Sequence, residues 1–177
     1  MTAAPVLDPR RTALVLVDLM DRLVALPLEP RKGAEVLTAC EELAARCRAG
    51  GALVVLVRVE RPTVAEQPPG SGLVAGLPHE GDREVVKRTI GAFQGTGLDE
   101  LLRDHGIDTL VLGGIATNLG VESTARAAAD LGYELVFVED AMAAFTAAEH
   151  DASVRLDFPR LGTVTTVGRL GFVAVRD

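Results

Sequence analysis

Two kinds of segment alternate along almost the whole chain, and this alternation limits the possible folds more than any other feature of the sequence. Short runs rich in Val, Leu and Ile are separated by longer stretches of Ala, Leu, Glu and Arg, whose apolar residues recur at helical spacing. We interpret the short runs as strands and the longer stretches as helices. Strands are expected at residues 13–18, 52–59, 85–87, 109–113, 134–139 and 163–166, with residues 172–175 as a candidate last edge strand.

The longer stretches connect one strand to the next. Helices are expected at residues 31–49, 97–105, 118–131 and 147–158. The last of these has a start signal, because Thr146 and Glu149 have the spacing of a capping box. Crossovers of this length are right-handed, so the pattern predicts an α/β fold, namely a three-layer α/β/α sandwich. Its sheet is expected to be doubly wound and mostly parallel, with about six strands and ligands outside their carboxyl ends, as in Rossmann-like folds.

One segment, residues 61–82, interrupts the alternation. It has neither helical nor strand periodicity and contains four prolines and four glycines. We therefore predict a long structured loop, and loops of this kind are often lids or interface arms. The alternative is an excursion without a role. Apolar residues make up 48% of the chain, which is enough for one buried core, so we predict a single domain over residues 1–177 in which residues 1–10 are flexible.

The charge of the chain argues against several classes of partner. Eighteen basic and 25 acidic residues give a net charge of −7, which repels phosphate backbones and anionic lipid headgroups. No apolar run approaches the roughly 18 to 20 residues of a spanning helix, and residues 1–10 lack the apolar core of a secretory signal. We therefore expect a cytoplasmic protein that binds a small molecule, with no nucleic-acid or membrane partner.

The cysteines and histidines form no disulfide or metal pattern. Cys40 and Cys47 are seven residues apart in an expected helix, so their Cα atoms should lie about 10 Å apart, too far for a disulfide. Buried apolar thiols are the simplest interpretation, and a redox or metal role is the alternative. The three histidines share no ligand spacing, so neither a metal nor another cofactor is expected.

Two charged residues end short apolar runs. Asp18 follows a Val-Leu-Val sequence, and Lys87 follows a Val-Val pair. The carboxyl ends of parallel strands share one edge of the sheet, so the two side chains can meet there. Together they would be either a plain ion pair or an acid/base couple, and Asp18 alone could be a turn former.

Residues 113–121 form a glycine-rich connection between an expected strand and an expected helix. They read Gly-Gly-Ile-Ala-Thr-Asn-Leu-Gly-Val, which places backbone amides of a helix N-terminus at the same edge of the sheet. Such amides suit an anion or an oxyanion. The spacing of a dinucleotide-binding motif is missing. A tight strand-to-helix connection without a ligand is the alternative.

Four ordered stretches of the sequence resemble the isochorismatase-like hydrolase superfamily. They are Val-Val-Lys-Arg-Thr-Ile-Gly-Ala-Phe-Gln-Gly-Thr from residue 85, Gly-Ile-Asp-Thr-Leu-Val-Leu-Gly-Gly-Ile-Ala-Thr-Asn from residue 106, Val-Glu-Ser-Thr-Ala-Arg from residue 121 and Val-Glu-Asp-Ala-Met-Ala-Ala-Phe-Thr from residue 138. The resemblance covers nearly the whole chain and implies the same α/β fold. Cysteine-hydrolase members of this superfamily carry a triad of Asp, Lys and Cys.

By this resemblance, Asp18 takes the place of the triad acid/base and Lys87 that of the triad lysine. Ile115 and Ala116 fall where the family usually has a cis peptide bond that directs backbone donors into an oxyanion hole. Gly120 departs from the family pattern, because Ala-Thr-Asn-x-Cys-Val-Glu-Ser-Thr reads Ala-Thr-Asn-Leu-Gly-Val-Glu-Ser-Thr here. A glycine has no side chain that could attack a substrate, so the alignment predicts that the protein is not a Cys-dependent amidase.

True isochorismatases resemble this chain in having glycine at that position, and they hydrolyse a vinyl ether to pyruvate and a dihydrodiol. By resemblance, Asp18 would be the general acid, a water in the space left by the absent thiol would be the nucleophile, and Lys87 would hold carboxylates. An acid that works near neutral pH needs a raised pKa, so burial of Asp18 must outweigh the nearby ammonium. Substrate-binding walls are expected from residues 61–82 and around Leu23 and Phe93.

Two functions stay open at this point. The first is a metal-independent, non-covalent hydrolase of a small carboxylated substrate, of isochorismatase type. The second is a homologue that has lost catalysis and binds a small acid or serves as an assembly subunit. An unrecognised reaction, or a Cys-to-Gly change made in the laboratory, is a further alternative. The resemblance also implies a homo-oligomer, either a dimer or a tetramer.

Overall fold

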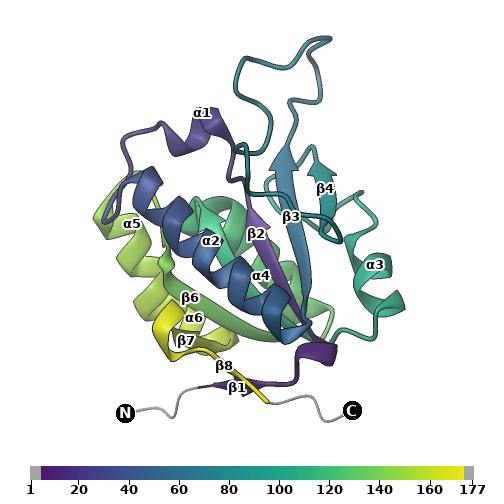
Figure 1. Ribbon diagram of the computed structural model, residues 1–177. Coiled ribbons are helices and arrows are strands. Elements are labelled where there is room, and N and C mark those ends of the chain that lie inside the picture. Colours follow the sequence, from purple (N-terminus) through teal and green to yellow (C-terminus); the bar gives the residue numbers. More distant parts are fainter. Residues whose placement is uncertain (1–4, 174–177) are drawn as a thin grey trace.

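The computed structural model describes residues 5–173 and contains a six-stranded sheet in which every neighbouring pair of strands is parallel (Figure 1). Each strand forms over one of the predicted apolar runs. The strands are β2 (Thr12–Val17), β3 (Leu53–Val59), β4 (Arg83–Lys87), β5 (Thr109–Ile115), β6 (Glu134–Ala143) and β7 (Thr163–Thr165). The predicted doubly wound parallel sheet is therefore confirmed.

The order of the strands in space places a switch point in the middle of the sheet. The order is β4-β3-β2-β5-β6-β7, so the chain moves outward from β2 to β4 and then returns to the other side of β2 with β5. In doubly wound sheets the ligand site lies at the carboxyl ends of the two strands where the direction reverses. Here these strands are β2 and β5, and the residues that follow them are Asp18 and Ala116.

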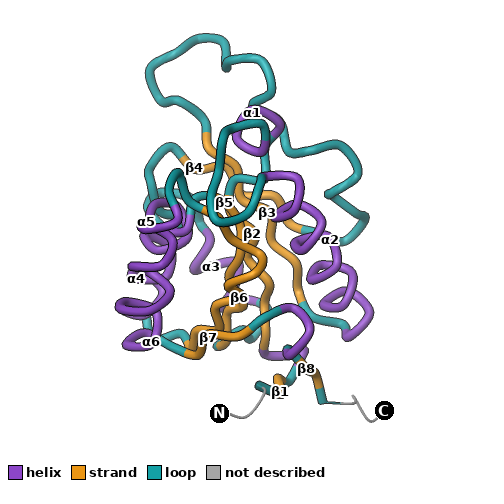
Figure 2. Tube along the Cα trace, turned by 90° about the vertical axis from the view of Figure 1, so that its left-hand side faces the viewer, coloured by secondary structure: helices purple, strands orange, loops and turns teal. Residues whose placement is uncertain are grey.

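Helices form the two outer layers of the sandwich. They are α1 (Asp21–Val24), α2 (Gly33–Gly50), α3 (Leu98–Asp104), α4 (Glu122–Asp130), α5 (Ala147–Ala152) and α6 (Phe158–Leu161), with short 3-10 turns at Pro9–Arg11 and Val167–Arg169. Helix α2 covers one face of the sheet, and α3, α4, α5 and α6 lie on the other (Figure 2). Within residues 5–173, no helix is both long and apolar enough to span a bilayer.

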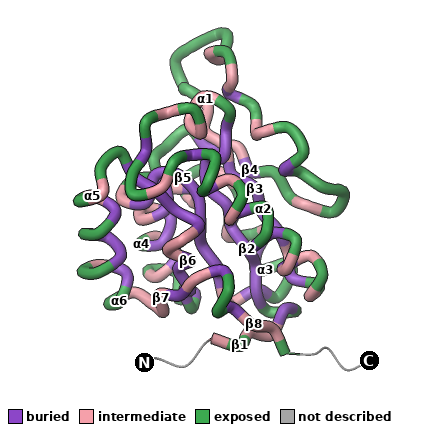
Figure 3. The backbone as a smooth tube through the Cα atoms, turned by 60° about the vertical axis from the view of Figure 1, so that its left-hand side comes forward, coloured by how far each residue is buried: buried purple, intermediate pink, exposed green. Residues whose placement is uncertain are grey.

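Alternate residues of the central strand β2 contribute to the two cores. Leu14 and Leu16 belong to the apolar cluster beneath α2, whereas Ala13, Val15 and Val17 belong to the cluster beneath α3 and α4. All five are at most 1% exposed, and the sheet forms the buried centre of the molecule (Figure 3). Burial on both faces explains why this strand is an uninterrupted apolar run rather than an alternation of apolar and polar residues.

The two cysteines pack into the core of the α2 layer. Cys40 and Cys47 are buried and not disulfide bonded, as the sequence predicts. Burial raises the pKa of both thiols, to about 12 for Cys47. Both thiols are therefore protonated and unreactive near neutral pH.

The ends of the described chain pair with each other instead of with the main sheet. Strand β1 (Val6–Leu7) lies parallel to β8 (Gly171–Phe172) in a separate two-stranded sheet. The prediction of an edge strand at residues 172–175 was therefore wrong in its partner, and residues 174 and 175 lie outside the described residues. The sequence predicts a flexible segment at residues 1–10, but Val6 and Leu7 within it form strand β1. Strand pairing between the two ends of a chain leaves no local pattern in the sequence.

Two of the predicted helices are interrupted by wider turns. The stretch predicted as a helix at 118–131 begins with a π-helical turn, Thr117–Val121, in which the carbonyl of Ala116 accepts a hydrogen bond from Val121 N (3.3 Å). The stretch predicted at 147–158 contains a second one, Ser153–Asp157, before α6. A single inserted residue hardly changes the average apolar spacing, so periodicity does not detect it. The short helix α1 was not predicted either.

Residues 61–82 form a long connection between β3 and β4. Its first part projects above the carboxyl end of the sheet (Figure 1). Its later part is attached to the body of the protein, because Val74 N donates to Leu19 O (3.0 Å) and Asp82 forms an ion pair with Arg48 (2.6 Å). The loop is therefore attached near the carboxyl end of β2 through Val74 and to the last turn of α2 through Asp82.

The capping box at α5 supports a first prediction. Thr146 Oγ1 accepts a hydrogen bond from Glu149 N (3.2 Å), and Thr146 N donates to the Glu149 carboxylate (2.9 Å). Thr146→Ala is expected to lower the free energy of unfolding by about 1 kcal/mol, measured by urea denaturation, because one helix N–H loses its acceptor. Thr38→Ala is the control, since Thr38 lies inside α2 and its hydroxyl only bonds back to Ala34 O. Equal effects of the two substitutions would contradict the capping role.

Candidate active site

Asp18 lies at the carboxyl end of β2 in an uncommon backbone conformation. Its φ angle is 56°, in the left-handed region that few residues other than glycine adopt. Its amide donates to Val57 O (2.7 Å), and its carbonyl accepts from Met20 N (2.9 Å), so the turn is held on both sides. Backbone of this kind is concentrated at functional sites. The turn brings the Asp18 carboxylate to the switch point of the sheet.

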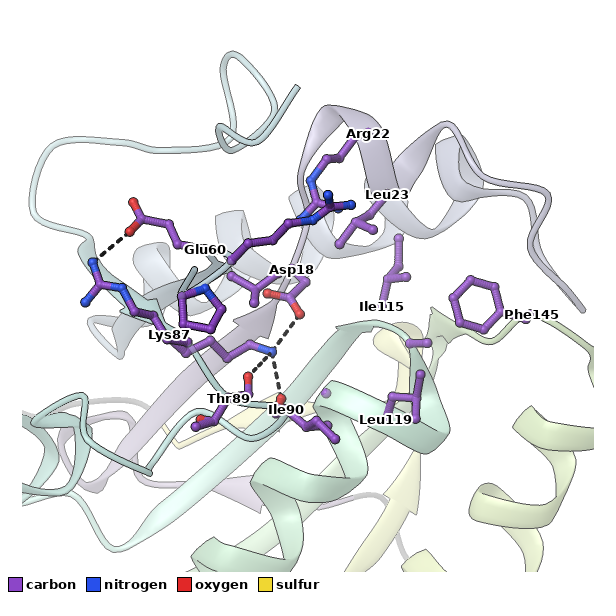
Figure 4. A pocket seen from close by; sticks show the side chains of 16 residues that line it. Asp18, Arg22, Leu23, Glu60, Lys87, Thr89, Ile90, Ile115, Leu119 and Phe145 are labelled. Atoms are coloured by element: carbon purple, nitrogen blue, oxygen red, sulfur yellow. Dashed lines mark hydrogen bonds and ion pairs between the residues drawn. The ribbon is translucent and has the colours of Figure 1, made fainter. Parts of the chain in front are cut away.

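Lys87 meets Asp18 across the end of β3. Its Nζ lies 2.8 Å from Asp18 Oδ2 and also donates to Ile90 O (2.7 Å) (Figure 4). The side chains are only 2% exposed for Lys87 and 7% exposed for Asp18. The structure therefore brings together the two charged residues that the sequence places at one edge of the sheet.

Burial dominates the electrostatics of Asp18. Desolvation raises the pKa of this carboxyl, while the Lys87 ammonium and, more weakly, the Arg22 guanidinium act in the opposite direction. The second carboxylate oxygen, Oδ1, is buried and accepts no hydrogen bond from any residue between 5 and 173. The raised pKa and the unpaired oxygen are both properties that suit a proton donor.

The third part of the site is the turn after β5. The peptide bond between Ile115 and Ala116 is cis, as the family resemblance implies. A Cβ atom added at Gly120 with ideal geometry would lie 3.3 Å from Asp18 Oδ2 and 3.5 Å from Lys87 Nζ. Residue 120 therefore adjoins both charged groups, and its glycine places no side chain between them.

Val17 reduces the free space next to Gly120. The same added Cβ atom would lie only 2.9 Å from Val17 Cγ1, which is shorter than real contacts of Cβ atoms. The expected space for a side chain at residue 120 is therefore partly filled by a core residue of β2. Any larger residue at this position requires the Val17 side chain to shift.

A cavity of about 370 Å³ opens above these groups. Its walls are mostly apolar and come from Leu23, Val59, Pro62, Ile90, Ile115, Ala116, Leu119 and Phe145. Three of them, Ile90, Leu119 and Phe145, remain between 41% and 61% exposed. An apolar cavity with a few convergent polar groups is the usual form of a small-molecule site.

The sequence predicts five site residues in addition to Asp18 and Lys87, and four of them line this cavity. Leu23, Ile115, Ala116 and Gly120 line the cavity. Phe93 does not, because the segment after β4 turns towards α4 and the Phe93 ring packs against Tyr133, with centroids 5.9 Å apart. Placing Phe93 in the wall of this cavity was therefore wrong.

Sequence reasoning missed several residues of the wall. Phe145 stands directly before the capping residue of α5, and Leu119 lies in the π-helical turn. Both stand within stretches that resemble the family, but the direction of their side chains depends on turns that periodicity does not detect. Of residues 61–82, only Arg61 and Pro62 line the cavity.

Two buried hydroxyl groups hold the turn that contains Gly120. Thr117 Oγ1 lies 2.8 Å from Nδ1 of His150, which is buried in α5 and whose pKa is lowered by burial. Thr124 Oγ1 donates to Gly120 O (2.6 Å) and accepts from Ala92 N (3.0 Å). These bonds connect the turn to α5 and to the segment that follows Lys87.

Comparison with known proteins identifies the family. The model of the isochorismatase domain matches residues 12–169. The uncharacterized isochorismatase family protein YecD of Escherichia coli O157:H7 is 40% identical over 178 residues, which cover 91% of this chain and 95% of that protein. The uncharacterized isochorismatase family protein YwoC of Bacillus subtilis (strain 168) is 38% identical over 180 residues, which cover 90% and 92%. Among solved structures, an isochorismatase family protein from Burkholderia thailandensis has a TM-score of 0.86 and 34% identity, covering 95% of this chain and 97% of that one. The chain therefore belongs to the isochorismatase family.

Proposed function

We propose that this protein is a hydrolase that cleaves a small carboxylated substrate without a covalent intermediate, with Asp18 as the general acid and water as the nucleophile. The observation that carries the proposal is the position of residue 120. It adjoins Asp18 Oδ2 and Lys87 Nζ, and as glycine it offers no nucleophile. An acid with a raised pKa remains at the floor of the cavity, and general acid catalysis is the chemistry available to it.

Vinyl-ether hydrolysis of the isochorismate type uses these groups in a simple order. Protonated Asp18 gives its proton to the methylene carbon of the enolpyruvyl group, and the ether carbon becomes an oxocarbenium ion. Water adds to that carbon and returns a proton to Asp18. The resulting hemiketal then breaks its bond to the ring oxygen, and the proton of the hemiketal hydroxyl passes to that oxygen. The products are pyruvate and an alcohol. Lys87 stabilises the Asp18 carboxylate while it is ionised.

The experiment is the release of pyruvate from isochorismate by the purified protein, followed as NADH oxidation by coupled lactate dehydrogenase. Turnover that is linear in enzyme concentration is the expected result. If a high enzyme concentration gives no turnover, the proposal fails for this substrate. Binding of small acids without turnover would instead support a homologue that has lost catalysis. Assembly as a dimer or tetramer stays a prediction.

Gly120→Cys tests whether residue 120 occupies the position of the family nucleophile. The Lys87 ammonium and the adjacent helix N-terminus both stabilise a thiolate, so the pKa of the new thiol is expected to lie below its ordinary value. Iodoacetamide should therefore alkylate residue 120 at pH 6, read by mass spectrometry. Cys40 and Cys47 are internal controls, because burial raises the pKa of their thiols and they should stay unmodified.

The contact with Val17 complicates this variant and also provides its control. Forcing Val17 aside is expected to cost about 1–3 kcal/mol. Val17→Ala combined with Gly120→Cys should relieve the contact and recover part of that stability. If the new thiol reacts no faster than a free cysteine in both variants, residue 120 does not occupy a nucleophile position.

A further inference from the structure

The segment that binds the Lys87 ammonium has no regular secondary structure. Residues 88–97 connect β4 to α3 without forming a helix or a strand. Two of their carbonyls accept hydrogen bonds from Lys87 Nζ, namely Ile90 O (2.7 Å) and, at a longer distance, Thr89 O (3.4 Å). The Ile90 residue is 61% exposed, so its side chain gives this part of the chain little packing. The position of the two carbonyls therefore depends on how the following residues are held.

The following two residues attach the segment to α4. Ala92 is fully buried, and its N–H donates to Thr124 Oγ1 (3.0 Å). Gly91 lies against the first turn of the helix, because an added Cβ atom would be 3.2 Å from both the carbonyl carbon and the carbonyl oxygen of Ser123. This distance is tighter than most contacts of Cβ atoms, so a side chain at residue 91 would push the segment away from α4. The carbonyl of Ile90 is thus placed by an attachment one and two residues further along the chain.

The Thr124 hydroxyl that holds this segment also holds the turn on the other side of the site. Thr124 is completely buried, and its Oγ1 donates to Gly120 O (2.6 Å). A hydroxyl group has one donor and two acceptor positions, and here two different segments use the donor and one acceptor. One buried oxygen atom therefore connects the segment that binds the ammonium of Lys87 to the turn that adjoins it.

We propose that Thr124 is a positioning residue of the site, whose hydroxyl holds the Lys87 ammonium against the Asp18 carboxylate by joining residues 89–92 to the Gly120 turn. Its effect passes through the Ile90 carbonyl to the ammonium, which lies 2.8 Å from Asp18 Oδ2. Hydrogen bonding and Coulomb energy change steeply at such a distance, so a small displacement of the ammonium alters Asp18. The inference deepens the proposed function and rests on it only for the role of Asp18 as the acid.

Thr124→Val tests the positioning role, because valine keeps the branched shape of threonine and removes both hydrogen bonds. The quantity measured is the pKa of Asp18, by carbon-13 NMR titration of protein labelled at the aspartate carboxyls, with the Asp18 signal assigned by its absence in Asp18→Asn. Two cations lower this pKa, Lys87 more strongly than Arg22. When the ammonium is no longer held against the carboxylate, the pKa of Asp18 is expected to rise, with a proton affinity about three-fold higher or more.

Three further variants separate this effect from a loss of stability. Thr124→Ser keeps the hydroxyl and should keep the pKa of the parent protein. Gly91→Ala keeps the hydroxyl but pushes the segment away from α4, so it should raise the pKa of Asp18 as Thr124→Val does. Thr12→Val removes the hydrogen bond of another buried threonine, to Asp8 O (2.8 Å), at the opposite end of β2. It should change the free energy of unfolding and leave the pKa of Asp18 as it is.

An unchanged or lower pKa of Asp18 in Thr124→Val would overturn the inference. A serine variant that behaves like the valine variant, or the same rise in Thr12→Val, would overturn it as well. Urea denaturation checks that each variant is folded under the conditions of the titration. If Thr124→Val does not fold, Gly91→Ala decides: a raised pKa supports the inference, and an unchanged one rejects it.

The titration needs no substrate, so its result does not depend on the proposed reaction. Where isochorismate is turned over, the pH at which kcat/KM falls should move upward in Thr124→Val by the same amount as the titrated pKa of Asp18. A titrated rise without that movement would keep Thr124 as the residue that positions the ion pair and would reject Asp18 as the general acid.

Discussion

Asp18→Asn is expected to lower kcat for pyruvate release from isochorismate by about 10³-fold, with the fold intact. Asparagine has nearly the same shape as aspartic acid but has no carboxyl proton to give to the methylene carbon. The raised pKa of Asp18 is the property that this substitution removes. The measurement is the rate of the lactate dehydrogenase-coupled assay for the variant and the parent, together with the midpoint of thermal unfolding.

The pH dependence of kcat/KM is a second test of the role of Asp18. General acid catalysis needs the protonated form, so kcat/KM is expected to fall as pH rises through the pKa of Asp18, which burial places above the ordinary 3.8. Any residual rate of Asp18→Asn should lack this fall. Asp21→Asn is the matched control, because it makes the same chemical change at an exposed residue three positions along the chain. If Asp18→Asn retains activity within ten-fold of the control, Asp18 is not the acid.

Lys87→Met is expected to lower the free energy of unfolding by about 3–5 kcal/mol, because it leaves a buried carboxyl without its partner. Methionine keeps the apolar stem of the side chain, so the loss comes from the ammonium. That ammonium pairs with Asp18 at 2.8 Å and donates to Ile90 O at 2.7 Å. Urea denaturation at pH 5 and pH 8 measures the effect.

The deficit of Lys87→Met is expected to be larger at the higher pH. The pKa of Asp18 is higher in the folded chain than in the unfolded chain, so this carboxyl favours folding at pH values below its unfolded pKa. That contribution is lost as pH rises through the folded pKa. Lys87 is the strongest opposing group, so its removal raises the pKa of Asp18 further and increases the loss of stability above it.

A double variant separates this explanation from simple loss of packing. The combination of Asp18→Asn with Lys87→Met leaves no charge in the position of the buried pair. Much of the lost stability should therefore be recovered, and the remaining deficit should no longer depend on pH. If Lys87→Met is as stable as the parent, or if the double variant is no more stable than Lys87→Met, the buried ion pair does not stabilise the fold.

Local sequence patterns predict the architecture and the edge of the sheet that bears the site. Runs such as residues 13–17 are apolar at every position, as expected of a parallel strand covered on both faces, and the helical periods between the runs indicate crossovers. In a parallel sheet every strand ends at one edge, so Asp18 after β2 and Lys87 at the end of β4 had to lie at the same edge, where they can meet. These features depend on local pattern and on general rules of topology.

Properties that depend on the distance between segments remote in sequence emerge only in the folded molecule. The pKa of Asp18 is raised because burial outweighs a cation 2.8 Å away, and neither burial nor that distance is encoded near Asp18. The turn after Lys87 carries Phe93 out of the cavity. The Arg61 guanidinium forms no ion pair with any residue between 5 and 173, whereas the Arg88 guanidinium pairs with Glu60. Coulomb energies and desolvation follow three-dimensional proximity, so these outcomes belong to the folded molecule and not to any stretch of its sequence.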